Sequence, residues 1–244
     1  MSKGWVLIAM LFAGTVTAQE EGGIALQHAG TDISNTESLQ RGARNFMNYC
    51  SGCHSLKYLR YNRLAADLKI PESELGNLMF TTDKSFETIN SAMPKDSEGW
   101  FGKQPPDLSL MARARGTDYL YSYLKGYYVD KTRPWGVNNL YLPSTAMPHV
   151  MQSLQGLQKP VYKNEPDAQG NASMVLTSLA IMTPGAMKPE EYDQFVRDIV
   201  NFLDYAGEPV KDKRQSMGVF VTLFLLVFFV FAYLLKKEYW KDVH

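Results

Sequence analysis

The chain has 244 residues, which is enough for one ordinary domain with appendages or for two small domains. Its 25 basic and 25 acidic residues balance, which argues against a dedicated nucleic-acid-binding protein, and 45% hydrophobic residues exclude a disordered chain. Two cysteines are too few for a disulfide scaffold.

The first 18 residues have the organisation of a secretory signal peptide. Lys3 precedes an apolar run from Trp5 to Ala13, and the small residues Val16-Thr17-Ala18 stand just before the polar Gln19. The apolar run is too short to span a bilayer comfortably, so an N-terminal membrane anchor is the weaker alternative. We therefore predict a signal peptide at 1–18 and export of the chain that follows.

Helical periodicity is clearest in three segments of the exported part. Residues 38–49 predict a helix capped by Ser38, residues 108–126 predict a second, and residues 189–205 predict a last one with Pro189 in its first turn. The intervening segments are rich in turn residues. There we expect short helical pieces at 60–68, 72–79 and 84–92, and a short hairpin around 163–174. This pattern predicts a mainly α domain with long loops.

The strongest motif follows the first predicted helix. Cys50-Ser51-Gly52-Cys53-His54 is the C-x-x-C-H pattern of covalent haem attachment, in which each thiol adds to one vinyl group and the histidine becomes the proximal iron ligand. A thioredoxin-like dithiol would need a βαβ setting, which the sequence does not predict. A zinc site would need further ligands, for which only His28, His149 and His244 remain. One such motif predicts one covalently bound haem c.

The iron ligand opposite His54 is not settled by spacing. A redox carrier commonly fills this position with methionine, which raises the potential, but twelve methionines make the residue type uninformative. Two of them stand in Ala-Met-Pro segments that suit a ligand loop, Met93 and Met147, and His149 is a third candidate. All three stay open on the residues alone.

The C-terminal region predicts a membrane anchor. Residues 217–235 carry no charge, and a helix of that length spans about 28 Å, close to the thickness of the hydrocarbon core. Interfacial aromatic and basic residues follow at 236–241, but basic residues flank both ends, so only the export signal orients the span. We expect an exported domain at 19–210, a linker and transmembrane anchor at 211–235, and a cytoplasmic tail at 236–244. The protein would cross the inner (cell) membrane once, with its haem domain on the periplasmic side.

Several segments together resemble the cytochrome c1 family of bacterial type, the haem subunit of the quinol–cytochrome c oxidoreductase (bc1) complex. Besides the C-x-x-C-H motif, they are Pro105-Pro106-Asp107-Leu108-Ser109 with Met111–Arg115, Asp118-Tyr119, the loop 141–148, and the helix, linker and anchor at 198–218. The resemblance covers nearly all of the mature chain. Residues 60–104 depart from the family pattern.

The resemblance implies a fold and a fuller site. The fold would be a class I-like cytochrome c domain with a single C-terminal transmembrane helix. In the family, the block containing Pro106 lines the haem edge, the arginine matching Arg115 approaches a propionate, and the tyrosine matching Tyr119 lies near the haem. The loop 141–148 resembles the one that supplies the methionine ligand, which favours Met147 over Met93. The iron ligands would be His54 and Met147, and the cofactor-binding residues Cys50, Cys53, His54, Pro106, Arg115, Tyr119 and Met147.

The implied function is electron transfer in a respiratory chain. The protein would take one electron from the Rieske iron–sulfur subunit, pass it to a soluble or membrane-bound cytochrome c, and assemble with cytochrome b. By itself it would be an electron carrier, whereas quinol oxidation would belong to the whole complex. The alternatives are a membrane-tethered cytochrome c of another electron-transfer chain, a haem-based sensor with an exchangeable iron site, and an anchored binding module.

Overall fold

A computed structural model of the chain describes residues 24–166 and 172–242. The predicted signal peptide at 1–18 lies outside these residues and stays a prediction. Helices dominate the described part, which also contains three two-stranded antiparallel sheets. One helix near the C-terminus is long and apolar enough to cross a membrane. The expectation of a mainly helical protein with a C-terminal anchor helix is therefore confirmed at this level.

The core is built on two helices from opposite ends of the chain. Helix α1 (Thr36–Tyr49) packs along α8 (Pro189–Gly207), and their apolar faces form much of the buried cluster. The two helices approach so closely that a Cβ at Gly42 would overlap the carbonyl oxygen of Asp198. Only glycine permits this crossing, because any larger side chain would push the helices apart.

The start of α1 differs from the expected one. Asn35, and not Ser38, is the N-cap, and its side-chain oxygen accepts a hydrogen bond from the Ser38 N–H at 3.0 Å. The Ser38 hydroxyl instead donates to Asp198 on α8 at 2.6 Å. Arg41 pairs with the same buried carboxylate through two nitrogens. Ser38 therefore joins the two core helices, a role that its place in the sequence does not reveal.

The segment after the C-x-x-C-H motif contains a small sheet. Strand β1 (Leu56–Arg60) pairs with β2 (Thr88–Ile89), and between them lie α2 (Tyr61–Leu68), α3 (Glu72–Leu75) and the 3₁₀ turn η1 (Gly76–Leu78). The expected helical pieces at 60–68 and 72–79 are thus confirmed. The one expected at 84–92 is wrong, because β-branched Thr88 and Ile89 pair with β1 instead of starting a helix.

The helix expected at 108–126 is divided in two. After the short turns η2 (Lys95–Ser97) and α4 (Glu98–Phe101), the chain forms α5 (Met111–Arg115) and α6 (Thr117–Lys125). The break falls at Gly116, whose φ of 84° is incompatible with a continuous helix. The apolar periodicity runs through the break, so it did not reveal that the chain changes direction there.

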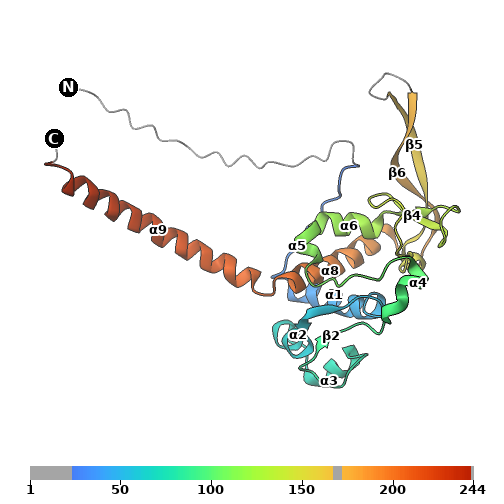
Figure 1. Ribbon diagram of the computed structural model, residues 1–244, viewed down its shortest axis with the longest axis horizontal. Helices are drawn as coiled ribbons and strands as arrows, with labels where there is room; N and C mark the ends of the chain where they lie inside the picture. The colour runs from blue at the N-terminus through green and yellow to red at the C-terminus, as the bar shows by residue number, and fades with distance from the viewer. Residues whose placement is uncertain (1–23, 167–171, 243–244) are drawn as a thin grey trace.

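A ribbon of strands completes the globular part. Strand β3 (Tyr127–Val129) pairs with β4 (Val137–Asn139), and after α7 (Gln152–Gln155) come β5 (Gly156–Pro166) and β6 (Ala172–Pro184). The expected hairpin around 163–174 is confirmed, but it is much longer than expected. Figure 1 shows it standing out from the globular part, whereas helix α9 (Lys211–Tyr239) leaves on the other side.

Candidate functional site

The C-x-x-C-H motif folds as a tight turn at the end of α1. The Cys50 N–H still bonds to Phe46 within the helix, and the Cys53 and His54 N–H groups both return to the Cys50 carbonyl, at 3.0 and 2.8 Å. Burial raises the pKa of the Cys50 thiol to about 12 and also raises the pKa of Cys53. A redox dithiol needs a lowered thiol pKa, so this site does not suit thioredoxin-like chemistry.

The imidazole of His54 is held in one orientation. Its Nδ1 lies 2.8 Å from the carbonyl oxygen of Pro106, and the ring is almost fully buried. A carbonyl oxygen can only accept, so Nδ1 carries the proton and Nε2 keeps its lone pair. This is the arrangement in which a histidine binds a metal through Nε2 while its other nitrogen is anchored to the protein.

The Pro106 carbonyl is itself fixed by its neighbours in the Pro-Pro-Asp-Leu-Ser block. The Asp107 carboxylate accepts from the backbone N–H of Lys57 at 2.9 Å and of Ser109 at 2.9 Å. The Leu108 N–H donates to the carbonyl of Ser55, the residue after His54, at 2.9 Å. The block is therefore tied to the segment that follows the C-x-x-C-H motif, which explains how Pro106 reaches the histidine.

Arg115 and Tyr119 come together at the break between α5 and α6. The guanidinium carbon of Arg115 lies 5.6 Å from the centre of the Tyr119 ring, within the range of a cation–π contact. Both arginines are exposed, but the stem of Arg113 lies beside Gly207 of α8. The two arginines thus face different ways, as their spacing on a helix predicts.

A row of aromatic rings leads from Tyr119 to the loop that carries Met147. The Tyr119 ring stacks on Tyr123 at 6.2 Å, and the Tyr123 ring meets Tyr127 at 5.6 Å. The Tyr127 hydroxyl donates to the main-chain carbonyl of Met147 at 3.2 Å. Burial raises the pKa of both Tyr123 and Tyr127, so their hydroxyls stay protonated at neutral pH.

His149 stands beside this row as a buried ring. It stacks on Tyr127 at 4.6 Å with only 1° between the ring planes. Burial lowers its pKa to about 4, and neither of its ring nitrogens has a hydrogen-bond partner among residues 24–166 and 172–242. The structure therefore shows a neutral histidine that packs against an aromatic residue.

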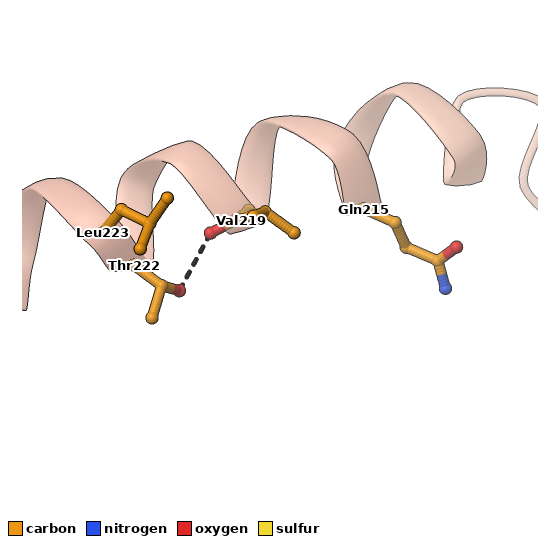
Figure 2. Close-up of a pocket in the computed structure, with 5 residues that line it drawn as sticks. Gln215, Val219, Thr222 and Leu223 are labelled. Carbon is orange, nitrogen blue, oxygen red and sulfur yellow. Dashed lines mark hydrogen bonds between the residues drawn. The ribbon is translucent and has the colours of Figure 1, made fainter.

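The surface has one hollow near the C-x-x-C-H turn and another on helix α9. One is lined by residues around the C-x-x-C-H turn, including Ser51, Gly52 and Tyr61. The other lies along α9 and is lined by Gln215, Val219, Thr222 and Leu223, with the Thr222 hydroxyl donating to the Gly218 carbonyl (Figure 2). The residues around the second hollow supply no metal-binding side chain, so it is not a candidate for the redox site.

The donor set fits a covalently bound haem. Cys50, Cys53 and His54 stand in one turn, and the His54 Nε2 lone pair is available. Within the part of the chain that the structure describes, no three His, Cys, Asp or Glu residues gather into a metal site, which removes support for zinc.

Reasoning from the sequence missed the residues that hold this site together. The sequence shows Asp107 and Ser109 only as part of a motif, and it gives no site role to Tyr123, Tyr127 or Thr145. Asp107 carries a usable signal, because an Asx residue after two prolines favours a side-chain-to-backbone turn. The tyrosines give no such signal, since their contacts join segments about twenty residues apart.

A family model and two of the three relatives described here carry the cytochrome c1 name. A sequence model described as the Cytochrome C1 family matches residues 29–99 and 89–243. A cytochrome c1 of Allochromatium vinosum is 49% identical over 237 residues, 96% of each chain. A protein named ammonia monooxygenase gamma subunit, of Nitrosomonas europaea, is 43% identical over 242 residues, 98% of each chain. A cytochrome b/c1 of Bradyrhizobium diazoefficiens is 24% identical over 241 residues, which cover 85% of this chain and 33% of that protein.

Proposed function

The chain belongs to the cytochrome c1 family, and from this premise we infer that it is the electron-transfer haem subunit of a bc1 complex, with one covalently bound haem c. The observation that carries this function in the structure is the hydrogen bond between His54 Nδ1 and the Pro106 carbonyl beside two cysteines in C-x-x-C-H spacing. This bond leaves one histidine nitrogen free for iron. When bound, the haem supplies a couple between ferrous and ferric iron that exchanges one electron.

We propose that Cys50 and Cys53 hold the haem through thioethers and that His54 is the proximal ligand. Pro106 orients His54 through its carbonyl, and the domain that these residues build is a class I-like cytochrome c fold. Arg115 and Tyr119 would lie at the haem periphery, where a guanidinium suits a propionate carboxylate. Their 5.6 Å contact supports this role, because the ring restricts where the guanidinium can point.

Met147 is our proposal for the second iron ligand. Met93 lies two residues beyond Ser91, whose N–H donates to Ser55 Oγ at 2.9 Å, so Met93 is tied to the same segment as His54. Met147 stands on an independent loop that packs against the core cluster. A ligand opposite His54 has to come from a segment that reaches the other face of the haem, which favours the independent loop.

The protein is anchored in a membrane by α9. We propose that the domain at 19–210 lies on the periplasmic side of the inner membrane and that the tail at 236–244 lies in the cytoplasm. Cytochrome b and the Rieske subunit would be the partners within the complex, and a soluble or membrane-bound cytochrome c the acceptor. The name of the Bradyrhizobium relative, which joins b and c1, supports the first of these partners.

The Nitrosomonas relative bears the name of a different complex, so the partners need a direct test. Mild-detergent purification of the full chain should recover a cytochrome b and an iron–sulfur protein with it. Haem peroxidase staining should persist on a denaturing gel, because thioether bonds survive denaturation. Recovery with another set of subunits would contradict the bc1 assignment, and loss of stain in a strain that matures c-type cytochromes would contradict covalent haem.

A membrane-tethered cytochrome c of another electron-transfer chain would also stain for haem, but it would not co-purify with cytochrome b and the iron–sulfur protein. A haem-based sensor would show an iron that binds carbon monoxide without any substitution, because a sensor needs an exchangeable position. Spectra of the ferrous protein with and without carbon monoxide therefore separate these alternatives from an electron carrier with both axial positions filled.

A further inference from the structure

The loop that carries Met147 is closed by a chain of three hydroxyl groups. Thr145 Oγ1 lies 2.9 Å from the Tyr123 hydroxyl, which lies 2.8 Å from the Tyr127 hydroxyl. The Tyr127 hydroxyl lies 3.2 Å from the main-chain carbonyl of Met147. Both ends of the chain therefore fall on the same loop, two residues apart.

The donor and acceptor roles in this series of hydrogen bonds can be assigned in only one way. A carbonyl oxygen accepts and never donates, so Tyr127 must donate to Met147. The Tyr127 oxygen then accepts from Tyr123, and the Tyr123 oxygen accepts from Thr145. Each hydroxyl donates once and accepts at most once, so removal of any one breaks a continuous series.

Tyr127 is the fixed point from which this chain is held. Its side chain is 1% exposed, and it lies on β3, paired with Asn139 of β4. Gln158 of β5 donates to its backbone carbonyl at 2.8 Å, and the His149 ring lies flat against its own ring. The hydroxyl is therefore carried by a rigid element, whereas the loop it binds has no regular structure between Leu140 and Val150.

We propose that Tyr127 is a positioning residue that holds Met147 in the conformation in which its sulfur binds the haem iron, with Tyr123 and Thr145 fixing the direction of the Tyr127 hydroxyl. The inference rests on the proposed role of Met147 as the ligand. In this proposal, Met147 competes with external ligands for the iron. Without the Tyr127 hydrogen bond, the Met147 carbonyl loses its buried donor, so the loop can move and withdraw the methionine sulfur. An external ligand then replaces Met147 more easily.

The test measures imidazole binding to the ferric full-length protein in detergent. Tyr127→Phe removes the hydroxyl and keeps the ring against His149, and we expect imidazole to bind about tenfold more tightly than to the wild type. The methionine–iron charge-transfer band should disappear at correspondingly lower imidazole. Thr145→Val should give a smaller increase in imidazole affinity. Thr145→Ser, which keeps the hydroxyl, should bind imidazole like the wild type.

Tyr192→Phe is the matched control. The Tyr192 hydroxyl also donates to a main-chain carbonyl at 3.2 Å from a buried ring, but its acceptor is Leu124 of α6, outside the Met147 loop. This variant should lower thermal stability as much as Tyr127→Phe does and leave imidazole affinity unchanged. Equal imidazole affinities for the Tyr127→Phe and Tyr192→Phe proteins would overturn the proposal.

Met147→Leu separates the inference from the ligand assignment beneath it. If this variant keeps the charge-transfer band, Met147 is not the ligand, and the role of Tyr127 falls with it. If the band is lost in Met147→Leu while Tyr127→Phe binds imidazole like the wild type, the ligand assignment stands and only the positioning role is wrong. Loss of the band together with the tenfold shift supports both.

Discussion

Asp107 shows how one side chain can determine the position of a residue it does not contact. Its carboxylate accepts two backbone N–H groups, from Lys57 and Ser109, and so holds Pro106 over His54. Such side-chain-to-backbone bonds commonly replace regular secondary structure where the chain must turn sharply. The proline pair adds rigidity, since each ring fixes its own φ.

We expect Asp107→Ala to lower the free energy of unfolding by about 2 kcal/mol, because hydrogen bonds to a charged acceptor are lost at two backbone donors. The thermal midpoint of the purified protein, followed by haem absorbance, measures this. Asp96→Ala is the control, since Asp96 is exposed and its side chain has no hydrogen-bond partner within the described ranges. Equal midpoints for the two variants would show that the Asp107 bonds do not contribute.

The C-x-x-C-H turn follows directly on α1, so its position depends on how α1 packs against α8. Gly42→Ala places a methyl group against the Asp198 carbonyl, and we expect a loss of at least about 1–3 kcal/mol, the usual cost of overpacking a core. The amount of haem protein in the membrane, read from its absorbance, should fall sharply.

Gly76→Ala provides the comparison for this substitution. A Cβ at Gly76 meets no atom within 4 Å, and its backbone is helical, so alanine fits without strain. The variant should accumulate like the wild type or slightly better, because alanine loses less chain entropy on folding. Similar losses at both glycines would mean that the close helix crossing is not what limits stability.

The junction between α8 and α9 is held by two ion pairs. Lys211 pairs with Asp204 at 2.8 Å, and Arg214 pairs with Glu208, whose pKa is lowered mainly by this hydrogen bond. A chain that ends after Gln215 retains both pairs and loses the apolar part of α9. We expect it to appear in the soluble fraction with its haem attached.

A chain that ends after Val210 loses both ion pairs and should be soluble with a lower thermal midpoint. The difference should shrink only in part at high salt, because salt screens the pair of the exposed Arg214 more than the partly buried pair of Lys211 with Asp204. Retention of either truncated protein on membranes after a high-salt wash would contradict the idea that α9 alone anchors the domain.

At the scale of the whole molecule, the sequence predicted local features better than long-range ones. Helices with a clear apolar stripe, such as α1 and α8, were placed to within a few residues, and the C-x-x-C-H motif identified its chemistry directly. The pairing of β1 with β2 and the division at Gly116 were missed. Both depend on contacts between distant segments or on a single backbone angle, which apolar periodicity does not encode.

The candidate site likewise contains residues that local sequence predicts and residues that it does not. Cys50, Cys53 and His54 follow from spacing, whereas Met147 could be chosen over Met93 only through a family resemblance. The residues that tie the parts together, Asp107 and Tyr127, act on groups fifty and twenty residues away. No short pattern records such partners, and the structure is needed to find them.

The pairing of α1 with α8 also sets an order of events during synthesis. More than half of the chain separates Cys53 from Pro189, so the cysteines are made on the order of ten seconds before α8 exists. In the finished fold Cys50 is only 8% exposed and belongs to the same buried cluster as apolar residues of α8. We therefore expect the haem to be joined before α8 packs against α1. A chain that stops after Met187 should still acquire haem on a denaturing gel, although it cannot complete its core.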